Sequence, residues 1–188
     1  MKKATPLIFQ QRHILPEGRM LLRIVTEEQK DLIKYAAKNG GYIAISMLDD
    51  ENSPSPADIA TRSKILDYLY GNGVLNVIVQ GLDCVRVTSI EENEQGILLA
   101  RGVAQPTWPA QEINGETRPL AEKLQSMFDR YPELSQLYSE MEFENLSWLC
   151  QRWLELLPLP PSEKQRLMSA QTCAQTTDYL ISLMQPPH

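Results

Sequence analysis

The sequence contains few of the side chains that hold metals or form disulfides. Among 188 residues there are two histidines and three cysteines. Neither H-x-x-H nor C-x-x-C occurs, so we expect no metal site. Cys84, Cys150 and Cys173 each lie in an apolar stretch, which predicts buried free thiols. This usage of cysteine is typical of a reducing compartment.

The motifs of several common enzyme classes are also missing. The chain has no G-x-x-x-x-G-K-[ST], no G-x-G-x-x-G and no G-x-S-x-G. Ser63 and Lys64 are neighbours, but adjacent residues of a strand point to opposite faces and do not form a nucleophile–base pair. We therefore predict that the protein is not an enzyme, has no catalytic residues and needs no cofactor.

The sequence also has no excess of positive charge and no long apolar run. The net charge is -6, whereas binding to a phosphate backbone requires an excess of lysine and arginine. No stretch approaches the ~18 consecutive apolar residues of a membrane span. The apolar run at residues 6–9 is too short for a signal peptide. We expect a cytoplasmic protein that binds neither membranes nor, by preference, nucleic acid.

The hydrophobic pattern changes from strands to helices along the chain. Residues 1–114 are predicted to form a β-rich subdomain with one helix near residues 27–38, and residues 115–188 a helical subdomain. Strands followed by helices predict the α+β class. Thr26 and Gln29 have the spacing of a capping box, and Gly40-Gly41 marks the end of the helix.

The β-rich part is predicted to contain an antiparallel meander. Short strands are expected at residues 61–70, 74–79, 84–90 and 97–103, with a hairpin turn at Asn72-Gly73 between the first two. A small barrel is favoured over an open sheet because open edges need covering. Residues 49–58 (DDENSPSPAD) are predicted to be a surface loop.

The helical part shows several apolar stripes. One stripe covers residues 120–131, and a short helix is expected around residues 134–141. Asn145 is the predicted cap of the following helix, and Ser162 and Thr172 are predicted to begin capping boxes.

The three tryptophans differ in their expected environments. Trp153 lies on the apolar stripe of its helix and is predicted to be in the core. Trp148 falls at the edge of that stripe and is a candidate for a partner-binding surface. Trp108 lies between two prolines at the junction of the two parts, where it either anchors them to each other or is exposed to a partner.

Segments spread over the whole chain resemble one known family. Residues 6–9 (PLIF), 14–18 (ILPEG) and 20–24 (MLLRI) are similar in order and spacing to the opening of the N-terminal domain of Lon proteases. Residues 77–81 and 84–87 resemble a later pair of strands of that domain. Residues 156–168 (LLPLPPSEKQRLM) are similar to its helical part. The resemblance covers residues 5–185 and identifies a free-standing member without the ATPase or protease domains.

This resemblance implies both a fold and a role. The fold is a PUA-like antiparallel β pseudo-barrel followed by a helical subdomain. The implied role is recognition of protein substrates, and we expect unfolded or specific polypeptides as partners. Trp108 and Trp148, singled out above from their positions in the sequence, are the candidate contacts. Two alternatives remain open at this point: an RNA-binding module, since PUA-like barrels often bind RNA, and a small-molecule sensor with a pocket between barrel and helices. The oligomeric state is open as well.

Overall fold

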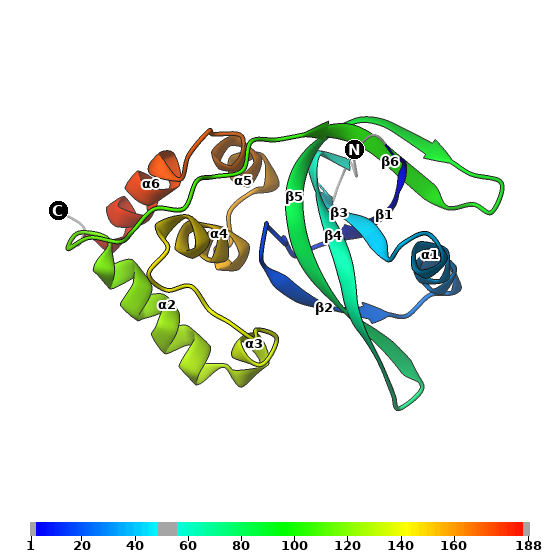
Figure 1. The fold of residues 1–188 in the computed structure, drawn as a ribbon, viewed down its shortest axis with the longest axis horizontal. Helices are drawn as coiled ribbons and strands as arrows, with labels where there is room; N and C mark the ends of the chain where they lie inside the picture. Colours follow the sequence, from blue (N-terminus) through cyan, green and yellow to red (C-terminus); the bar gives the residue numbers. More distant parts are fainter. Residues whose placement is uncertain (1–2, 49–55, 186–188) are drawn as a thin grey trace.

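The structure is a computed structural model that describes residues 3–48 and 56–185. A sheet with one helix forms one half of the molecule, and the remaining helices pack at one end of it (Figure 1). The strands are β1 (Thr5–Gln10), β2 (Arg19–Ile24), β3 (Tyr42–Leu48), β4 (Pro56–Gly71), β5 (Val74–Glu92) and β6 (Leu98–Ala104). The helices are α1 (Glu27–Lys38), α2 (Arg118–Arg130), α3 (Pro132–Ser135), α4 (Leu146–Leu156), α5 (Pro161–Met168) and α6 (Ala174–Met184).

The six strands form one sheet that closes on itself. Their order is β2-β5-β4-β3-β1-β6, and an additional pairing of β5 with β6 completes a ring of five strands. β2 lies outside this ring and pairs with β5. The α+β class and the barrel-like sheet followed by helices are thereby confirmed.

The strand pattern differs from the predicted meander in two respects. β5 is one continuous strand through the predicted strands at 74–79 and 84–90, because a register shift opposite Arg62 and Ser63 bends it without ending it. β1 and β3 pair in parallel. A parallel pair requires a crossover connection, which α1 supplies here.

Local turn and capping signals were reliable around the sheet. The Thr26 side chain accepts from the Gln29 amide, and the Gln29 side chain accepts from the Thr26 amide, so the predicted capping box is present. Asn72 and Gly73 have φ values of 52° and 76°, as a two-residue hairpin turn between β4 and β5 requires. Of the predicted loop, residues 49–55 lie outside the described residues, and β4 begins at Pro56, within the rest of it.

The helical predictions were partly correct. Asn145 caps α4 by accepting from the Ser147 amide, as expected. The helix expected around residues 134–141 is the single turn α3. The capping boxes at Ser162 and Thr172 are wrong, because α5 begins with Pro161 at its first turn and α6 follows Cys173 without a side-chain cap. No helix in the described ranges is long and apolar enough to cross a membrane.

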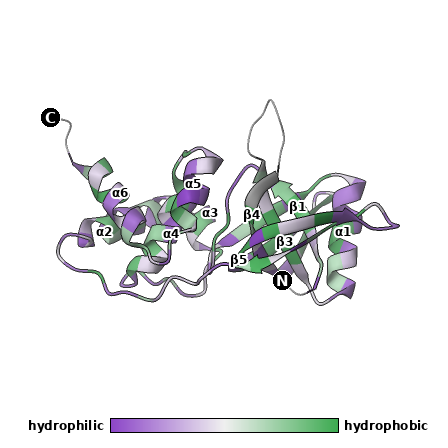
Figure 2. Cartoon of the chain, turned by 90° about the horizontal axis from the view of Figure 1, so that it is seen from above, coloured by the Kyte–Doolittle hydropathy of each residue, from purple (hydrophilic) through white to green (hydrophobic). Residues whose placement is uncertain are grey.

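Two large apolar cores hold the molecule together. One lies inside the barrel and under α1, which covers the end of the sheet remote from the other helices (Figure 2). The second lies among α2–α6 and includes Leu15 and Ile59, both contributed by the sheet part of the chain. Apolar contact therefore crosses between the sheet and the helices. Whether residues 1–114 and 115–188 are separate folding units stays a prediction.

Gly81 lies where two chain segments approach each other closely. Its amide donates to the Gly18 carbonyl and its carbonyl accepts from the Glu17 amide. A Cβ at position 81 would lie 2.2 Å from the carbonyl oxygen of Leu15. Only glycine fits this point, where β5 bends and residues 15–18 cross it.

We therefore expect Gly81→Ala to destabilise the protein. Forcing extra volume into such a contact costs ~1–3 kcal/mol of unfolding free energy, measurable by urea denaturation. Gly115→Ala is the matched control, because a Cβ there meets no atom within 4 Å. Equal stability of the two variants would contradict the close approach.

Candidate functional site

Trp148 is part of the helical core. Its side chain is only 3% exposed. Its ring packs edge-to-face against Phe128, Tyr138 and Phe143, at centroid distances of 6.2, 5.9 and 5.5 Å. The guanidinium of Arg152 lies over the ring, 5.2 Å from its centroid. The prediction that Trp148 contributes to a partner-binding surface is therefore wrong, since its neighbours cover it on several sides.

Trp108 is also buried, at 7% exposure, in the core that contains Leu15 and Ile59. Its indole nitrogen donates to the Ala170 carbonyl at 2.8 Å. These contacts fit the interpretation of Trp108 as an anchor, and they correct the alternative in which it faces a partner. Trp153 is half-buried against the same core and donates to the Leu120 carbonyl at 3.1 Å.

A group of buried polar side chains lies where residues 13–18 meet α4 and α5, a zone that we call the seam. Arg152 is 1% exposed and donates to the Pro16 carbonyl at 2.7 Å. It also forms an ion pair with Glu155, one turn along α4. Next to the seam, the Arg19 amide donates to the Tyr138 hydroxyl at 3.0 Å. Helices and sheet are thus joined by polar contacts as well as by apolar ones.

Burial changes the acidity of the titratable groups in the seam. It raises the pKa of Glu155 to about 7, although Arg152 acts in the opposite direction. Burial lowers the pKa of Lys164, which Glu155 partly offsets. Burial and the positive charge of Lys164 lower the pKa of His13 to about 3. Its Nδ1 is buried without a hydrogen-bond partner.

Perturbed groups of this kind also occur in catalytic sites, but here their partners are structural. Glu155 is held by Arg152 and accepts from the Leu15 backbone. Burial raises the pKa of the neighbouring Cys84 thiol to about 12, which keeps it protonated and a poor nucleophile. Within the described part of the chain, no three His, Cys, Asp or Glu side chains come together as metal ligands.

The seam carries a shallow recess with a cavity volume of about 20 Å³. Its walls are formed by Leu15, Pro16, Cys84, Gln105, Pro106, Thr107, Trp108, Gln151 and Met168. Small-molecule sites usually span ~300–1,000 Å³ and enclose most of their ligand, so this recess is far too small to hold one.

The most distinctive surface is the distal end of the β4–β5 hairpin, residues 66–77, which we call the hairpin arm. The arm extends beyond the barrel (Figure 1). Four large side chains of the arm are exposed to solvent, and only Asp67 interrupts their run in the sequence: Leu66, Tyr68, Leu69 and Tyr70. Tyr70 is 78% exposed. Exposed side chains of this size are normally scattered singly over a surface, so their concentration in one hairpin is informative.

The strand register extends this apolar surface onto β2. Leu21 of β2 pairs with Ile78 of β5, and Arg23 pairs with Asn76, which in turn pairs with Leu69 of β4. Direct cross-strand partners share a face of the sheet. We call the face that carries Leu21, Ile78 and Leu69 the outer face.

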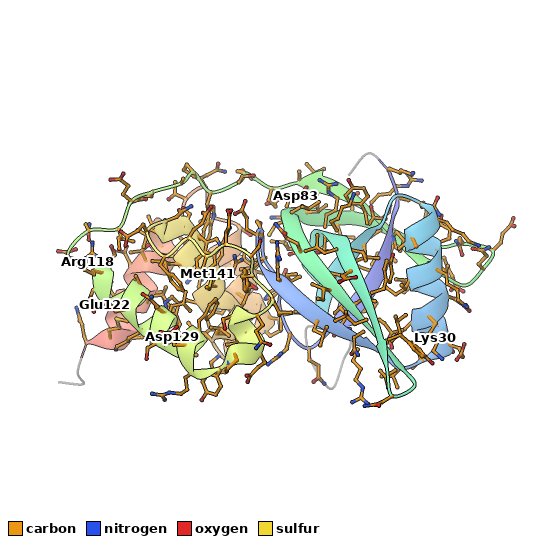
Figure 3. The ribbon with its side chains drawn as sticks, turned by 60° about the horizontal axis from the view of Figure 1, so that its bottom comes forward. Lys30, Asp83, Arg118, Glu122, Asp129 and Met141 are labelled. Atoms are coloured by element: carbon orange, nitrogen blue, oxygen red, sulfur yellow. The ribbon has the colours of Figure 1, made fainter. Side chains whose placement is uncertain are left out.

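Tyr68 and Tyr70 pair with Val77 and Leu75 in the alternate rows, so the arm presents apolar side chains on both faces. The pKa of Lys30, on α1, is raised mainly by its pairing with Glu27 and to a small extent by Tyr70, so Lys30 lies near Tyr70. Figure 3 shows Lys30 on the side of α1 toward the end of the arm. Tyr70, on the second face of the arm, therefore lies near α1.

The outer face also carries more positive than negative charge. Arg19, Gln80 and Lys64 form one row across β2, β5 and β4, and Arg23 lies in another. Asp67 occupies the row of Leu21 and Ile78. This local balance is opposite to the net charge of -6 of the whole chain.

Sequence reasoning missed the hairpin arm as a site. The signal was present in residues 65–70 (ILDYLY), where apolar residues occupy both faces of a predicted strand. Such a strand is either buried on both faces or leaves apolar side chains exposed to solvent. Whether the strand is buried or exposed depends on how far the hairpin extends past its neighbouring strands. The sequence of the hairpin alone does not specify this length.

Comparison with known proteins agrees with this architecture. The family described as the ATP-dependent protease La (LON) substrate-binding domain matches residues 7–186. None of the curated proteins matches the chain.

Two solved structures have a similar fold. The Lon N-terminal domain protein from Xanthomonas campestris has a TM-score of 0.73 and 21% identity, covering 97% of this chain and 99% of that one. The N-terminal domain of the Mycobacterium avium complex Lon protease has a TM-score of 0.63 and 17% identity, covering 96% and 97%.

The burial of Trp108 predicts a large effect of truncation. We expect Trp108→Ala to lower the free energy of unfolding by ~3 kcal/mol or more, because a buried aromatic leaves a cavity and its hydrogen bond to Ala170 is lost. Calorimetry should show a midpoint lowered by several degrees and a single transition. A variant as stable as the parent would contradict the anchoring role.

His13 predicts a specific pH dependence of stability. Between pH 6.5 and about 3, the unfolded chain binds a proton at His13 that the folded chain does not. This contribution therefore destabilises the fold as the pH falls, by up to ~1.4 kcal/mol per pH unit. Glu155 acts oppositely between pH 7 and 4.5, since its folded pKa is raised.

Comparison of the parent protein with the variant His13→Leu isolates the contribution of His13 to the pH dependence of stability. Relative to the parent, this variant should gain stability steadily as the pH is lowered from 6.5 to 5 in urea titrations. The difference between the two proteins should be constant above pH 7. A pH-independent difference throughout would contradict a buried, neutral His13.

Proposed function

Because the chain belongs to the Lon substrate-binding domain family, we propose that it is a non-catalytic module that binds unfolded polypeptides through the hairpin arm and the adjoining outer face. The chain carries a Lon-like substrate-binding module. We propose in addition that this module lacks catalytic activity, that the arm and the outer face form its binding surface and that its partners are unfolded polypeptides.

The exposed apolar arm is the observation that carries the proposal. Unfolded chains differ from folded ones chiefly in the apolar side chains and backbone groups that they expose. Leu66, Leu69 and Leu21 offer apolar area that water now covers, and burying it contributes ~25 cal/mol per Å². The contact needs no fixed sequence in the partner, which suits a module that accepts varied polypeptides.

The cations of the outer face are the feature most relevant to the RNA alternative. Arg19 is largely engaged, since its guanidinium donates to the Leu137 carbonyl at 2.8 Å and to the Ser139 hydroxyl at 3.3 Å. Lys64 lies over the Tyr42 ring, 4.6 Å from its centroid. Phosphate binding relies on several available cations, and the chain as a whole is acidic. A polypeptide therefore suits this surface better than RNA does.

The same proposal places the protein in the cytoplasm. Cys84, Cys150 and Cys173 are all free thiols, which is the usual state in a reducing compartment.

We expect a double substitution in the arm to weaken polypeptide binding. The probe is fluorescent α-lactalbumin, reduced and blocked with iodoacetamide so that it stays unfolded, and binding is measured by anisotropy. Replacing Leu66 and Leu69 by Gln removes two exposed apolar side chains, worth ~1 kcal/mol or more together, and should raise Kd about tenfold.

The matched control is Leu183→Gln, which changes a leucine of similar exposure, 53% against 44%, on α6. It should change Kd less than about twofold. Native, disulfide-bonded α-lactalbumin should not bind. Equal binding of the arm variant and the parent would refute the assigned surface, and binding of a short RNA in preference to the unfolded probe would reverse the choice of partner.

A further inference from the structure

Within the described residues, β2 has one edge without a partner strand. It pairs with β5 on one side only, and it lies outside the closed ring of the barrel. Such an edge exposes backbone donors and acceptors that another extended chain can pair with. β2 is therefore a part of the sheet where the backbone itself can take part in recognition.

Two hydrogen bonds fix which amides of β2 point outward. The Arg19 amide donates to the Tyr138 hydroxyl at 3.0 Å, and the Val25 amide donates to Oε1 of Gln29 at 2.8 Å. Neither amide therefore points to β5. In an antiparallel pair, alternate residues direct both N–H and C=O to the same side. Because the β2–β5 register runs without a shift, Leu21 and Arg23 share the outward direction.

The free edge is short and has defined ends. Tyr138 covers it at Arg19, and Gln29 covers it just beyond the strand at Val25. The side chains of Leu21 and Arg23 between these ends are exposed. The window spans about 13 Å from residue 20 to residue 24, enough for three to five residues of an extended segment.

We propose that an extended segment of a bound polypeptide adds to β2 as a new edge strand, hydrogen-bonded to the backbone of Leu21 and Arg23. This rests on the proposed function and specifies its binding mode. Backbone pairing provides affinity that is independent of sequence, and only an unfolded chain has such a segment free.

The side chains beside the free edge of β2 favour certain residues in the added strand. A residue of the incoming strand opposite Leu21 is favoured when it is apolar, and the residue two positions away, opposite Arg23, when it is acidic. Both would lie on the outer face, next to Ile78 and Asn76. The preferred segment therefore has an apolar and an acidic residue two positions apart.

The backbone donor at position 23 can be removed by substitution. Arg23→Pro deletes the outward N–H, and proline is tolerated at an edge strand when that group faces away from the ladder. Arg23→Thr is the matched control, because it removes the charge but keeps the N–H. With the blocked α-lactalbumin probe, we expect Kd to rise about tenfold for Arg23→Pro and less than about threefold for Arg23→Thr. Equal Kd values for the two variants would overturn the proposal.

Amide hydrogen exchange of the unsubstituted protein gives a second test that does not depend on a proline variant folding. Bound probe should slow exchange at Leu21 and Arg23 at least tenfold. It should have little effect at Met20 and Leu22, whose amides already pair with β5. Unchanged exchange at Leu21 and Arg23, with probe bound, would overturn strand addition while leaving polypeptide binding intact.

Two other outcomes would also overturn the proposed strand addition. If the probe does not bind the unsubstituted protein at all, both the strand addition and the proposed function fail. If Leu21 and Arg23 exchange slowly without probe, and more slowly as the protein concentration is raised, β2 pairs with a second copy of the chain. That result would overturn the assignment of the edge to a polypeptide partner.

Discussion

The guanidinium of Arg152 couples the helices to the sheet. It reaches from α4 to the carbonyl of Pro16, pairs with Glu155 and lies over Trp148, and it is almost completely excluded from water. A buried charge is tolerated only where its partners stay in place, because losing one of them costs ~3–5 kcal/mol. The position of α4 relative to residues 15–18 is therefore tightly constrained, and α4 lies at the centre of the helical core.

This constraint determines which surfaces remain available. The helices α2–α6 cover one end of the barrel and α1 covers the opposite one (Figure 1). The hairpin arm and the side chains of Leu21 and Arg23 on β2 are left exposed. An exposed apolar hairpin beside a free strand edge is a liability for aggregation. Arg23 and Asp67, placed among the apolar residues of the outer face, are the kind of charges that limit such self-association. The surface thus combines features that attract an unfolded chain with features that discourage a second copy.

The sequence predicted local features well and long-range ones poorly. The capping box at Thr26, the turn at Asn72-Gly73 and the change from strands to helices depend on neighbouring residues, and all three are present. The parallel pairing of β1 with β3 and the continuity of β5 depend on residues far apart in the chain. Periodicity within one segment carries no information about either.

The candidate site was harder to predict for the same reason. Trp148 lies at the edge of its helical stripe, and only the packing of Phe128, Tyr138 and Phe143 around it shows that it is buried. Residues 66–70 resemble part of an ordinary strand in sequence, and only the reach of the hairpin beyond the barrel shows that they are exposed. The predicted contact residues were tryptophans, Trp108 and Trp148, whereas the exposed side chains of the arm are leucines and tyrosines.

The central claim is that polypeptides bind to the sheet and not to the helices. It is tested most directly by titrating the isotopically labelled protein with unfolded, blocked α-lactalbumin and following the backbone amide resonances. We predict that the perturbed amides concentrate in β2 and in residues 66–77, and that α2, α5 and α6 change little. Perturbations concentrated on those helices, or around the recess at Trp108 and Met168, would contradict the account.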